Sequence, residues 1–243
     1  MNLIVDIGNS RVKMAVVEGR EILAQRVSER FHEQMVVELK RLYPSIERAI
    51  VASTGVDSLP IAEAIRGCIG HCLIFDSTVA VPLKSVYASP ETLGADRIAA
   101  AVGVNKMYAG RNIAMVDFGT AITIDLITAD GTFRGGYISC GVQMRFRALH
   151  DYTSRLPMCS PTEEFSSLGI STEECIVNGV MQGVVGEIES HIRRLSEKNV
   201  NLLIIFAGGD AKYFVKQIKN AIFADCEPVI CGLNAILEYN EVE

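Results

Sequence analysis

The sequence predicts an α/β protein made of two duplicated domains, each built around a mixed β-sheet, with a ligand cleft between them. Three observations support this fold class. An apolar strand that ends in Asp-X-Gly and a polar turn occurs twice, as LIVDIGNS at 3–10 and as IAMVDFGT at 113–120. Each copy continues as a three-strand meander with glycine-containing turns. Each meander is followed by alternating helix and strand patterns. We therefore place the domains at residues 1–115 and 116–243.

The first copy is predicted to follow the order β-β-β-α-β-α-β. Apolar runs between turn residues indicate the strands, and apolar residues three or four apart indicate the helices. From the N-terminus these elements lie at 3–8, 11–17, 21–27, 31–43, 48–54, 58–67 and 72–76. A further helix is expected over 96–107, beginning within the sequence LGADR. Its alanine and valine stripe indicates that it packs against another element.

The second copy is predicted to repeat this order with two additional helices. One follows the first helix of the copy, and the other follows its last strand. Its strands are expected at 113–119, 122–128, 132–138, 201–209 and 227–230. Its helices are expected at 141–156, 171–198, 211–219 and 233–240. The long helix begins with a capping box formed by Ser171 and Glu174.

The composition indicates a cytoplasmic globular protein. The chain has 243 residues and a net charge of −6, and its Lys and Arg residues are scattered. We therefore expect no nucleic acid and no membrane as partners. No secretory leader is expected, and the 7 cysteines show no disulfide framework. Cys68, His71 and Cys72 lack the spacing of a zinc site, so core positions are favoured over a metal site there.

The first Asp-X-Gly turn, DIGNSRVK, carries groups suited to the phosphate tail of a nucleotide. Asp6 ends an otherwise apolar strand, which is costly unless its carboxylate faces a partner. Gly8 allows the main chain to approach a ligand, and Asn9 and Ser10 offer donors. Lys13, on the following strand, carries a charge suited to phosphate oxygens. An ordinary hairpin with a polar turn is the alternative for this segment alone.

The second turn, DFGTA, repeats the pattern without a lysine. Asp117 is placed to face a cation, and Thr120 offers a hydroxyl and an amide to a phosphate. Asp125 lies on the next strand, where a structural and a functional role are equally supported. The sequence AGGD at 207–210 suits either a site for a base and ribose or a tight turn in which Asp210 caps a helix.

Phosphate-loop, Rossmann and nucleophile-elbow motifs are absent from the sequence. The Asp-X-Gly turns instead resemble those of the actin-like, Hsp70-like and sugar-kinase-like ATPases, which have two duplicated ribonuclease-H-like domains with an interdomain cleft. Within this superfamily, the chain is similar to type III pantothenate kinases along nearly its whole length. The similarity rests on an ordered motif series: DIGNSRVK at 6–13, YASPETLGADR at 87–97, DFGTAITID at 117–125, GGYISCG at 135–141, TSRLP at 153–157, GISTEECI at 169–176 and AGGDA at 207–211.

The resemblance implies an ATP-dependent kinase that phosphorylates the terminal hydroxyl of pantothenate to give 4'-phosphopantothenate, the first step of coenzyme A biosynthesis. It implies Mg²⁺ and a monovalent cation, K⁺ or NH₄⁺, as cofactors beside ATP, and a homodimer. The implied ATP-binding residues are Asp6, Ile7, Gly8, Asn9, Ser10, Arg11, Val12, Lys13 and Thr120. The implied pantothenate-binding residues are Tyr87, Gly94, Ala95, Asp96, Arg97 and Thr172. Asp117 is implied to help bind the monovalent cation.

Asp96 is further implied to be the general base that takes the proton of the attacking hydroxyl. Its place at a helix start agrees with this role, since phosphoryl transfer depends on positioning and charge neutralisation. Arg97, beside it, suits a bidentate contact with the pantothenate carboxylate. The alternatives are a helix-dipole role for Asp96, a surface cation at Arg97, a packed loop residue at Tyr87 and a first-turn helix residue at Thr172.

Two residues depart from the family pattern. Cys140 stands where a proline is usual, and Ala207 stands where a threonine is usual, so loop order and nucleotide affinity are the properties in question. Two other functions remain open: a nucleotide-binding regulatory protein without catalysis, and a kinase of the superfamily that acts on another substrate. The stripe at 98–104 and the helix after Ser171 are the expected dimer contacts.

Overall fold

Two compact units make up the structure, a computed structural model that describes residues 1–218, 221–224 and 227–240. The first unit contains residues 1–109, residues 131–133 and the C-terminal segment that carries α6 (Pro228–Tyr239). The second contains residues 110–130 and the chain from Arg134 through β11 (Ala221–Phe223). The boundary expected from the sequence, between 115 and 116, lies close to the first junction. The C-terminal helix, which we expected in the second domain, packs with the first unit instead.

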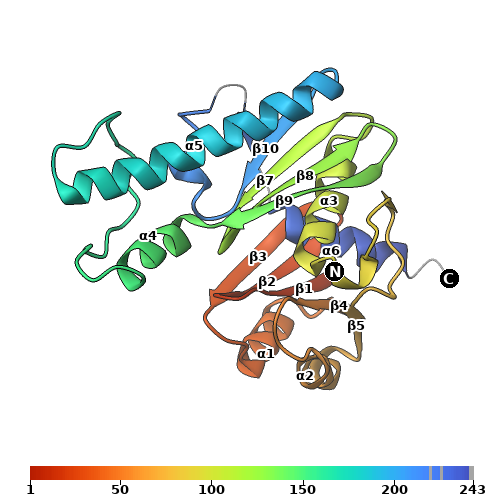
Figure 1. Ribbon diagram of the computed structural model, residues 1–243. Helices are drawn as coiled ribbons and strands as arrows, with labels where there is room; N and C mark the ends of the chain where they lie inside the picture. The colour runs from red at the N-terminus through yellow and green to blue at the C-terminus, as the bar shows by residue number, and fades with distance from the viewer. Residues whose placement is uncertain (219–220, 225–226, 241–243) are drawn as a thin grey trace. The chain divides into compact units, whose positions relative to one another are not determined.

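The first unit is built on a five-stranded mixed sheet in the order β3-β2-β1-β4-β5. Its elements are β1 (Asn2–Ile7), β2 (Val12–Glu18), β3 (Glu21–Ser28), α1 (Glu33–Leu42), β4 (Arg48–Ser53), α2 (Leu59–Ile69) and β5 (His71–Phe75). The central β1 pairs antiparallel with β2 and parallel with β4. Figure 1 shows α1 and α2 on one side of this sheet and α6 on the other.

The sheet of the second unit repeats this topology. Its elements are β7 (Ile113–Phe118), β8 (Ala121–Thr128), β9 (Thr132–Cys140), α4 (Val142–Asp151), α5 (Thr172–Lys198), β10 (Leu203–Ala207) and β11. The order β9-β8-β7-β10-β11 matches that of the first sheet strand for strand, with β7 antiparallel to β8 and parallel to β10. The predicted duplication into two α/β units with mixed sheets is therefore confirmed. The short β6 (Lys84–Ser85) pairs with Thr132 and Phe133 at the start of β9.

Alternation along the central strands decides which residues enter each core. In β1, Leu3 and Val5 are fully buried in the cluster formed with α1 and α2. Successive side chains of a strand point to opposite faces, so Asn2 and Asp6 point to the face covered by α6. Asn2 confirms this, because its amide donates to Asn234 of α6 at 2.8 Å.

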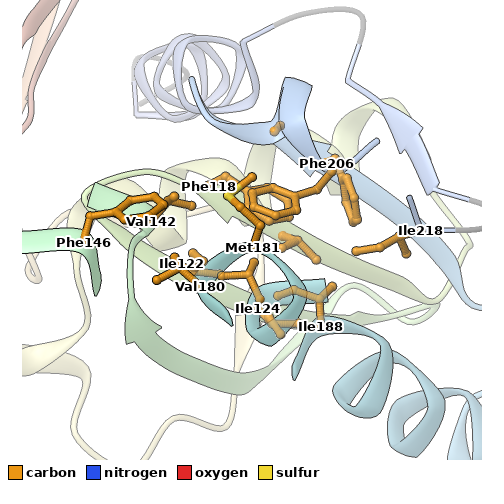
Figure 2. Close-up of a cluster of buried hydrophobic side chains, with 14 of the residues drawn as sticks. Phe118, Ile122, Ile124, Val142, Phe146, Val180, Met181, Ile188, Phe206 and Ile218 are labelled. Atoms are coloured by element: carbon orange, nitrogen blue, oxygen red, sulfur yellow. The ribbon is translucent and has the colours of Figure 1, made fainter. Parts of the chain in front are cut away.

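The core of the second unit lies between its sheet and α5. Figure 2 shows Phe118 and Phe206, from neighbouring strands, beside Met181 of α5. The ring of Phe118 lies 4.9 Å from that of Phe206 and 5.0 Å from that of Phe214, measured between centroids. These distances are typical of favourable aromatic pairs, so the end of β7 is held firmly.

The helix α3 (Ala95–Met107) is buried on nearly all sides because it packs against α6. Two glycines let the helix backbones meet: a Cβ on Gly232 would lie 1.7 Å from the carbonyl oxygen of Ala99, and one on Gly103 would lie 2.1 Å from that of Pro228. The stripe at 98–104 is therefore buried inside the first unit. Its expected role as a dimer contact is wrong.

Two predictions for the C-terminal part are also corrected, and one strand there was missed. Residues 227–230 were expected as a strand, but α6 begins at Pro228, because proline suits the first helical turn and α3 supplies an apolar partner. The expected helix at 211–219 is a short 3₁₀-helix, Ala211–Tyr213, followed by turns that bury Phe214 and Ile218; residue 219 lies outside the described residues. The strand β11 was not predicted, since its three residues are too few for a periodic signal.

The contact between α3 and α6 leads to a first prediction. Gly232→Ala should lower the free energy of unfolding by about 3 kcal/mol or more, because the added methyl group meets backbone that cannot yield. Urea denaturation of the two proteins measures this loss.

The matched control is Gly67→Ala on α2 of the same unit, where a Cβ would meet nothing within 4 Å. This variant should be stabilised by roughly 0.5–1 kcal/mol, because alanine is the better helix former. Equal effects of the two substitutions would contradict the proposed contact.

Candidate active site

The first Asp-X-Gly turn places a carboxylate directly opposite a lysine. Asp6 on β1 and Lys13 on β2 are cross-strand partners, so their side chains lie on the same face of the sheet. The turn between them is closed by the amide of Gly8, which donates to the carbonyl of Arg11 at 3.0 Å. A positive and a negative group therefore lie together at the end of a rigid hairpin.

The side chains of this turn fall into two groups. Those of Ile7 and Val12 are only 4% and 3% exposed and belong to the core, so these residues can offer a ligand only their main-chain atoms. Residues 8–11 are exposed. The polar part of the predicted ATP-binding set is thus accessible, and its apolar part anchors the turn.

Lys13 has a partner that sequence reasoning missed. Its Nζ lies 2.6 Å from Oε2 of Glu227, the residue that precedes α6. The two residues are separated by 214 positions, and nothing in the local sequence around either one indicates the pairing. Both side chains are about a third exposed, so the pair is worth little in stability. Its effect is to fix the direction in which the lysine points.

Asp96 lies in the first turn of α3, as the sequence predicted. Its Oδ1 accepts a hydrogen bond from the backbone amide of Arg97 at 2.8 Å. A Cβ on Gly94 would lie 2.6 Å from the same oxygen, so the glycine leaves room for the carboxylate. The carboxylate thus lies at the N-terminal, positive end of the helix dipole.

Arg97 is buried, with 8% of its surface exposed, and lies among aromatic rings. Its guanidinium carbon is 5.8 Å from the ring centroids of both Tyr87 and Phe133. The alternative of a surface cation is therefore excluded, and Tyr87 is a packed residue that contacts this arginine. Phe133 was missed because a single aromatic residue at a strand start carries no functional signal. It is held there by the Val86 amide, which donates to its carbonyl at 3.1 Å.

In the second turn, the segment after β10 folds onto the end of β7. Gly208 has a φ of +92°, and a Cβ on it would lie 2.4 Å from Oδ1 of Asp117 and 2.5 Å from the carbonyl oxygen of Phe118. The amide of Asp210 donates to that carbonyl at 3.2 Å. Asp210 makes no side-chain cap hydrogen bond, so the expectation of an N-cap at this turn is not met. The AGGD segment instead packs the main chain of Gly208 against Asp117.

Thr120 is exposed beside this carboxylate, and its turn contacts the segment that precedes α4. A Cβ on Gly141 would lie 2.1 Å from the carbonyl oxygen of Thr120 and 2.6 Å from that of Gly119. Cys140, which stands where the family usually has proline, is exposed. Its carbonyl accepts a hydrogen bond from Nε of Arg145 at 2.8 Å. The departure from the family pattern therefore lies in a segment that side-chain hydrogen bonds hold in place.

Glu187 on α5 completes this cluster with a contact of 2.6 Å to Arg145. Burial by itself would raise the pKa of Glu187. Hydrogen bonds from Ser139 and Arg145, together with the charges of Arg145 and His191, outweigh burial and lower the pKa below its usual value. Glu187 therefore stays ionised in mildly acidic solution.

Asp125 is 2% exposed, and a Cβ on Gly136 of β9 would lie 2.7 Å from its Oδ1.

Thr172 is the first residue of α5 and lies on the wall of a mainly apolar groove of about 770 Å³ between α4 and α5. Thr172 thus belongs to the second unit, whereas Tyr87 and residues 94–97 belong to the first.

The described residues contain no group of three or more histidine, cysteine or acidic residues arranged to hold a metal ion. No helix among them is both long enough and apolar enough to cross a bilayer.

Comparison with known sequences assigns this arrangement to a family. The profile of type III pantothenate kinases matches residues 2–194. The chain belongs to the type III pantothenate kinase family. A type III pantothenate kinase from Christiangramia forsetii is 38% identical over 246 residues, which cover 100% of both chains. Another from Porphyromonas gingivalis strain W83 is 38% identical over 242 residues, covering 98% of each.

Solved structures confirm the fold. A Campylobacter jejuni protein assigned provisionally to the Baf family of transcriptional activators superposes with a TM-score of 0.66 at 19% identity, covering 99% of this chain and 100% of that one. A Sinorhizobium meliloti protein assigned provisionally as a 2-dehydro-3-deoxygalactonokinase gives a TM-score of 0.62 at 12% identity, with 99% of each chain covered. At these identities the likeness concerns the fold alone.

The lowered pKa of Glu187 leads to a prediction about stability and pH. The ionised carboxylate stabilises the folded state fully above the usual glutamate pKa, 4.5, and this contribution is lost as the pH falls through the lowered pKa. The difference in free energy of unfolding between the wild type and Glu187→Gln should thus be constant from neutral pH to about pH 5 and shrink at lower pH.

The control is Glu163→Gln, because Glu163 is exposed and lies 3.9 Å from Lys216 in a surface pair. Denaturation at several pH values should show little difference for this variant. A difference for Glu187→Gln that does not change with pH would contradict the assignment.

Proposed function

We propose that this chain transfers the γ-phosphate of ATP to the terminal hydroxyl of pantothenate, giving 4'-phosphopantothenate and ADP. The observation that carries the proposal is Asp96, fixed at the start of α3 beside the buried Arg97, in a chain that matches pantothenate kinases over its full length. A protein of this fold that had lost catalytic activity would not need a carboxylate held in this way. The arrangement therefore favours a kinase over a regulatory protein.

Asp96 acts as the general base of the proposed reaction. The hydroxyl oxygen of pantothenate forms a bond to the γ-phosphorus while the bond between that phosphorus and the β,γ-bridging oxygen breaks. The hydroxyl proton passes to the carboxylate of Asp96, and ADP leaves with the bridging oxygen. A base of this kind contributes typically 10²–10⁴-fold to the rate.

The turn from Asp6 to Lys13 holds the phosphates in this proposal. Lys13 and the main chain of residues 8–11 contact phosphate oxygens, and Thr120 is a further proposed contact of the nucleotide. Asp6, opposite Lys13, suits Mg²⁺ because that ion prefers carboxylate oxygens together with phosphates. When bound, Mg²⁺ neutralises charge that develops on the phosphates.

Asp117 is proposed to help hold a monovalent cation, K⁺ or NH₄⁺. The groups around it fit such an ion, because its carboxylate lies among main-chain atoms, with the carbonyl of Phe118 next to Gly208. Oxygen donors of this kind suit hard cations. The cation would supply positive charge near the bound nucleotide.

The pantothenate site is proposed to include Tyr87, Gly94, Ala95, Asp96 and Arg97, with Thr172. The guanidinium of Arg97 lies beside the adjacent rings of Tyr87 and Phe133, and its planar fork of donors suits a bidentate contact with the pantothenate carboxylate. Because the arginine is buried, such a contact would be stronger than one at the surface.

The proposal is tested by measuring ADP release from Mg·ATP, with and without pantothenate and with K⁺ or Na⁺. Wild-type release should require pantothenate and K⁺. Asp96→Asn should lower kcat by about 10²–10⁴-fold, because the base is lost, while the Kd for ATP changes little. Asp117→Asn should instead weaken the response to K⁺.

Glu33→Gln is the matched control, since Glu33 is an exposed acid in the first turn of α1. It should leave the rate unchanged, which separates loss of the base from loss of a helix-end charge. If the protein binds ATP but pantothenate does not stimulate ADP release, the proposal is wrong. That result would favour a regulatory protein or a kinase that acts on another substrate.

We also propose a cytoplasmic homodimer. The thiols of Cys68, Cys72, Cys140, Cys159 and Cys175 form no disulfide, as expected in a reducing compartment. The side chains of Tyr152, Leu168 and Ile170, near the start of α5 and its groove, are 89%, 78% and 91% exposed, which is unusual for a monomer.

The dimer proposal predicts that sedimentation at micromolar concentration finds twice the monomer mass. Ile170→Asp should shift the distribution toward the monomer, because it places a charge in an apolar contact. Val200→Asp is the control, because Val200 is another exposed aliphatic residue, with 79% of its surface accessible. A wild type that sediments as a monomer would rule out the dimer.

A further inference from the structure

Arg145, in the first turn of α4, joins three elements of the second unit through its side chain. Its Nη2 lies 2.6 Å from Oε2 of Glu187 on α5 and donates to Oγ of Ser139 at 3.2 Å. Its Nε donates to the carbonyl of Cys140 at 2.8 Å. The planar guanidinium can make these contacts at once because its donors form a rigid fork.

The backbone held by Arg145 contacts the Gly119–Thr120 turn directly. At Gly141, a Cβ would lie 2.1 Å from the carbonyl oxygen of Thr120, so no side chain can lie between the two segments. The amide of Arg145 also donates to the carbonyl of Gly141 at 3.1 Å. Any shift of residues 139–141 is therefore transmitted to the turn by contact of main chain with main chain.

The Gly119–Thr120 turn is an exposed part of the hairpin between β7 and β8. The amide of Gly119 donates to the carbonyl of Ala121 at 3.2 Å, and Thr120 is exposed. The turn lies between the Gly141 segment, which contacts the carbonyls of Gly119 and Thr120, and Phe118 of the buried core. Arg145 is exposed over 21% of its side chain and Glu187 over 26%, so their contact is partly shielded from solvent.

We propose that Arg145 is a positioning residue for the nucleotide: held by Glu187, it fixes residues 139–141 and through them the Gly119–Thr120 turn. This inference rests on the proposed function, because it assigns Thr120 to the nucleotide. It extends that function to an ion pair of α4 and α5 that does not touch the ligand. The expected consequence is specific for ATP, since the residues assigned to pantothenate, Thr172 apart, belong to the first unit.

The test compares Arg145→Gln, Arg145→Lys and Glu187→Gln in ATP titrations and in steady-state assays. Arg145→Gln should raise the Kd and KM for Mg·ATP about tenfold, equivalent to ~1.4 kcal/mol, with a much smaller change in KM for pantothenate. Arg145→Lys keeps the charge without the fork and should fall between the wild type and Arg145→Gln. Glu187→Gln, nearly isosteric, should act in the same direction.

The double variant Arg145→Gln/Glu187→Gln should bind ATP no more weakly than Arg145→Gln alone, because both changes break one unit. Arg147→Gln is the control: Arg147 is exposed on the same helix and should leave the Kd unchanged. Melting temperatures of all variants are measured in parallel, so that loss of stability is separated from loss of nucleotide binding.

Two results would overturn the inference. One is a lower melting temperature for Arg145→Gln and Glu187→Gln with an unchanged Kd for ATP, which assigns the pair to stability alone. The other is an equal rise in KM for ATP and pantothenate. The titration needs no pantothenate, so it also decides the inference if the kinase assay fails. A wild type that binds no nucleotide would overturn the inference and the proposed function together.

Discussion

Main chain meets main chain wherever the candidate site is assembled, and glycine is the residue that permits it. Gly208 lies against Asp117 and the carbonyl of Phe118, with a positive φ that other residues rarely adopt. Gly141 lies against the carbonyl of Thr120, and Gly232 brings α6 onto α3. Such contacts cannot be adjusted by side-chain rotation, so they fix the ends of strands and helices more firmly than ordinary packing does.

The two duplicated turns follow corresponding strands, but they differ by one residue in length and in the charge opposite the aspartate. Opposite Asp6 stands Lys13, whereas opposite Asp117 stands Thr123, which carries no charge. A carboxylate beside a lysine suits an anion that carries its own metal ion. A carboxylate among main-chain atoms suits a cation. In the proposed function, threonine in place of lysine across the hairpin is thus the difference that favours a cation beside Asp117 and a phosphate beside Asp6.

Local patterns predicted the parts of this protein that short segments determine by themselves. The Asp-X-Gly hairpins and the start of α3 with Asp96 follow from strand alternation and turn chemistry, and the structure has them where expected. Local sequence patterns do not indicate contacts between distant segments. Glu227 reaches Lys13 across 214 positions, and Arg145 reaches Glu187 across 42. Residues 227–230 have strand-like composition, but a proline and the surface of α3 make them helical.

The helix α6 places the lysine and the proposed base in one rigid frame. Asn234 joins it to the sheet, accepting from Asn2 at 2.8 Å and donating to the carbonyl of Gly19 at 3.2 Å. Its N-terminal end presents Glu227 to Lys13, and its middle packs against α3, whose first turn carries Asp96. A phosphate held by Lys13 and a hydroxyl held near Asp96 would therefore be positioned by one helix. Phosphoryl transfer benefits from this arrangement, because its rate depends chiefly on the relative placement of the two reactants.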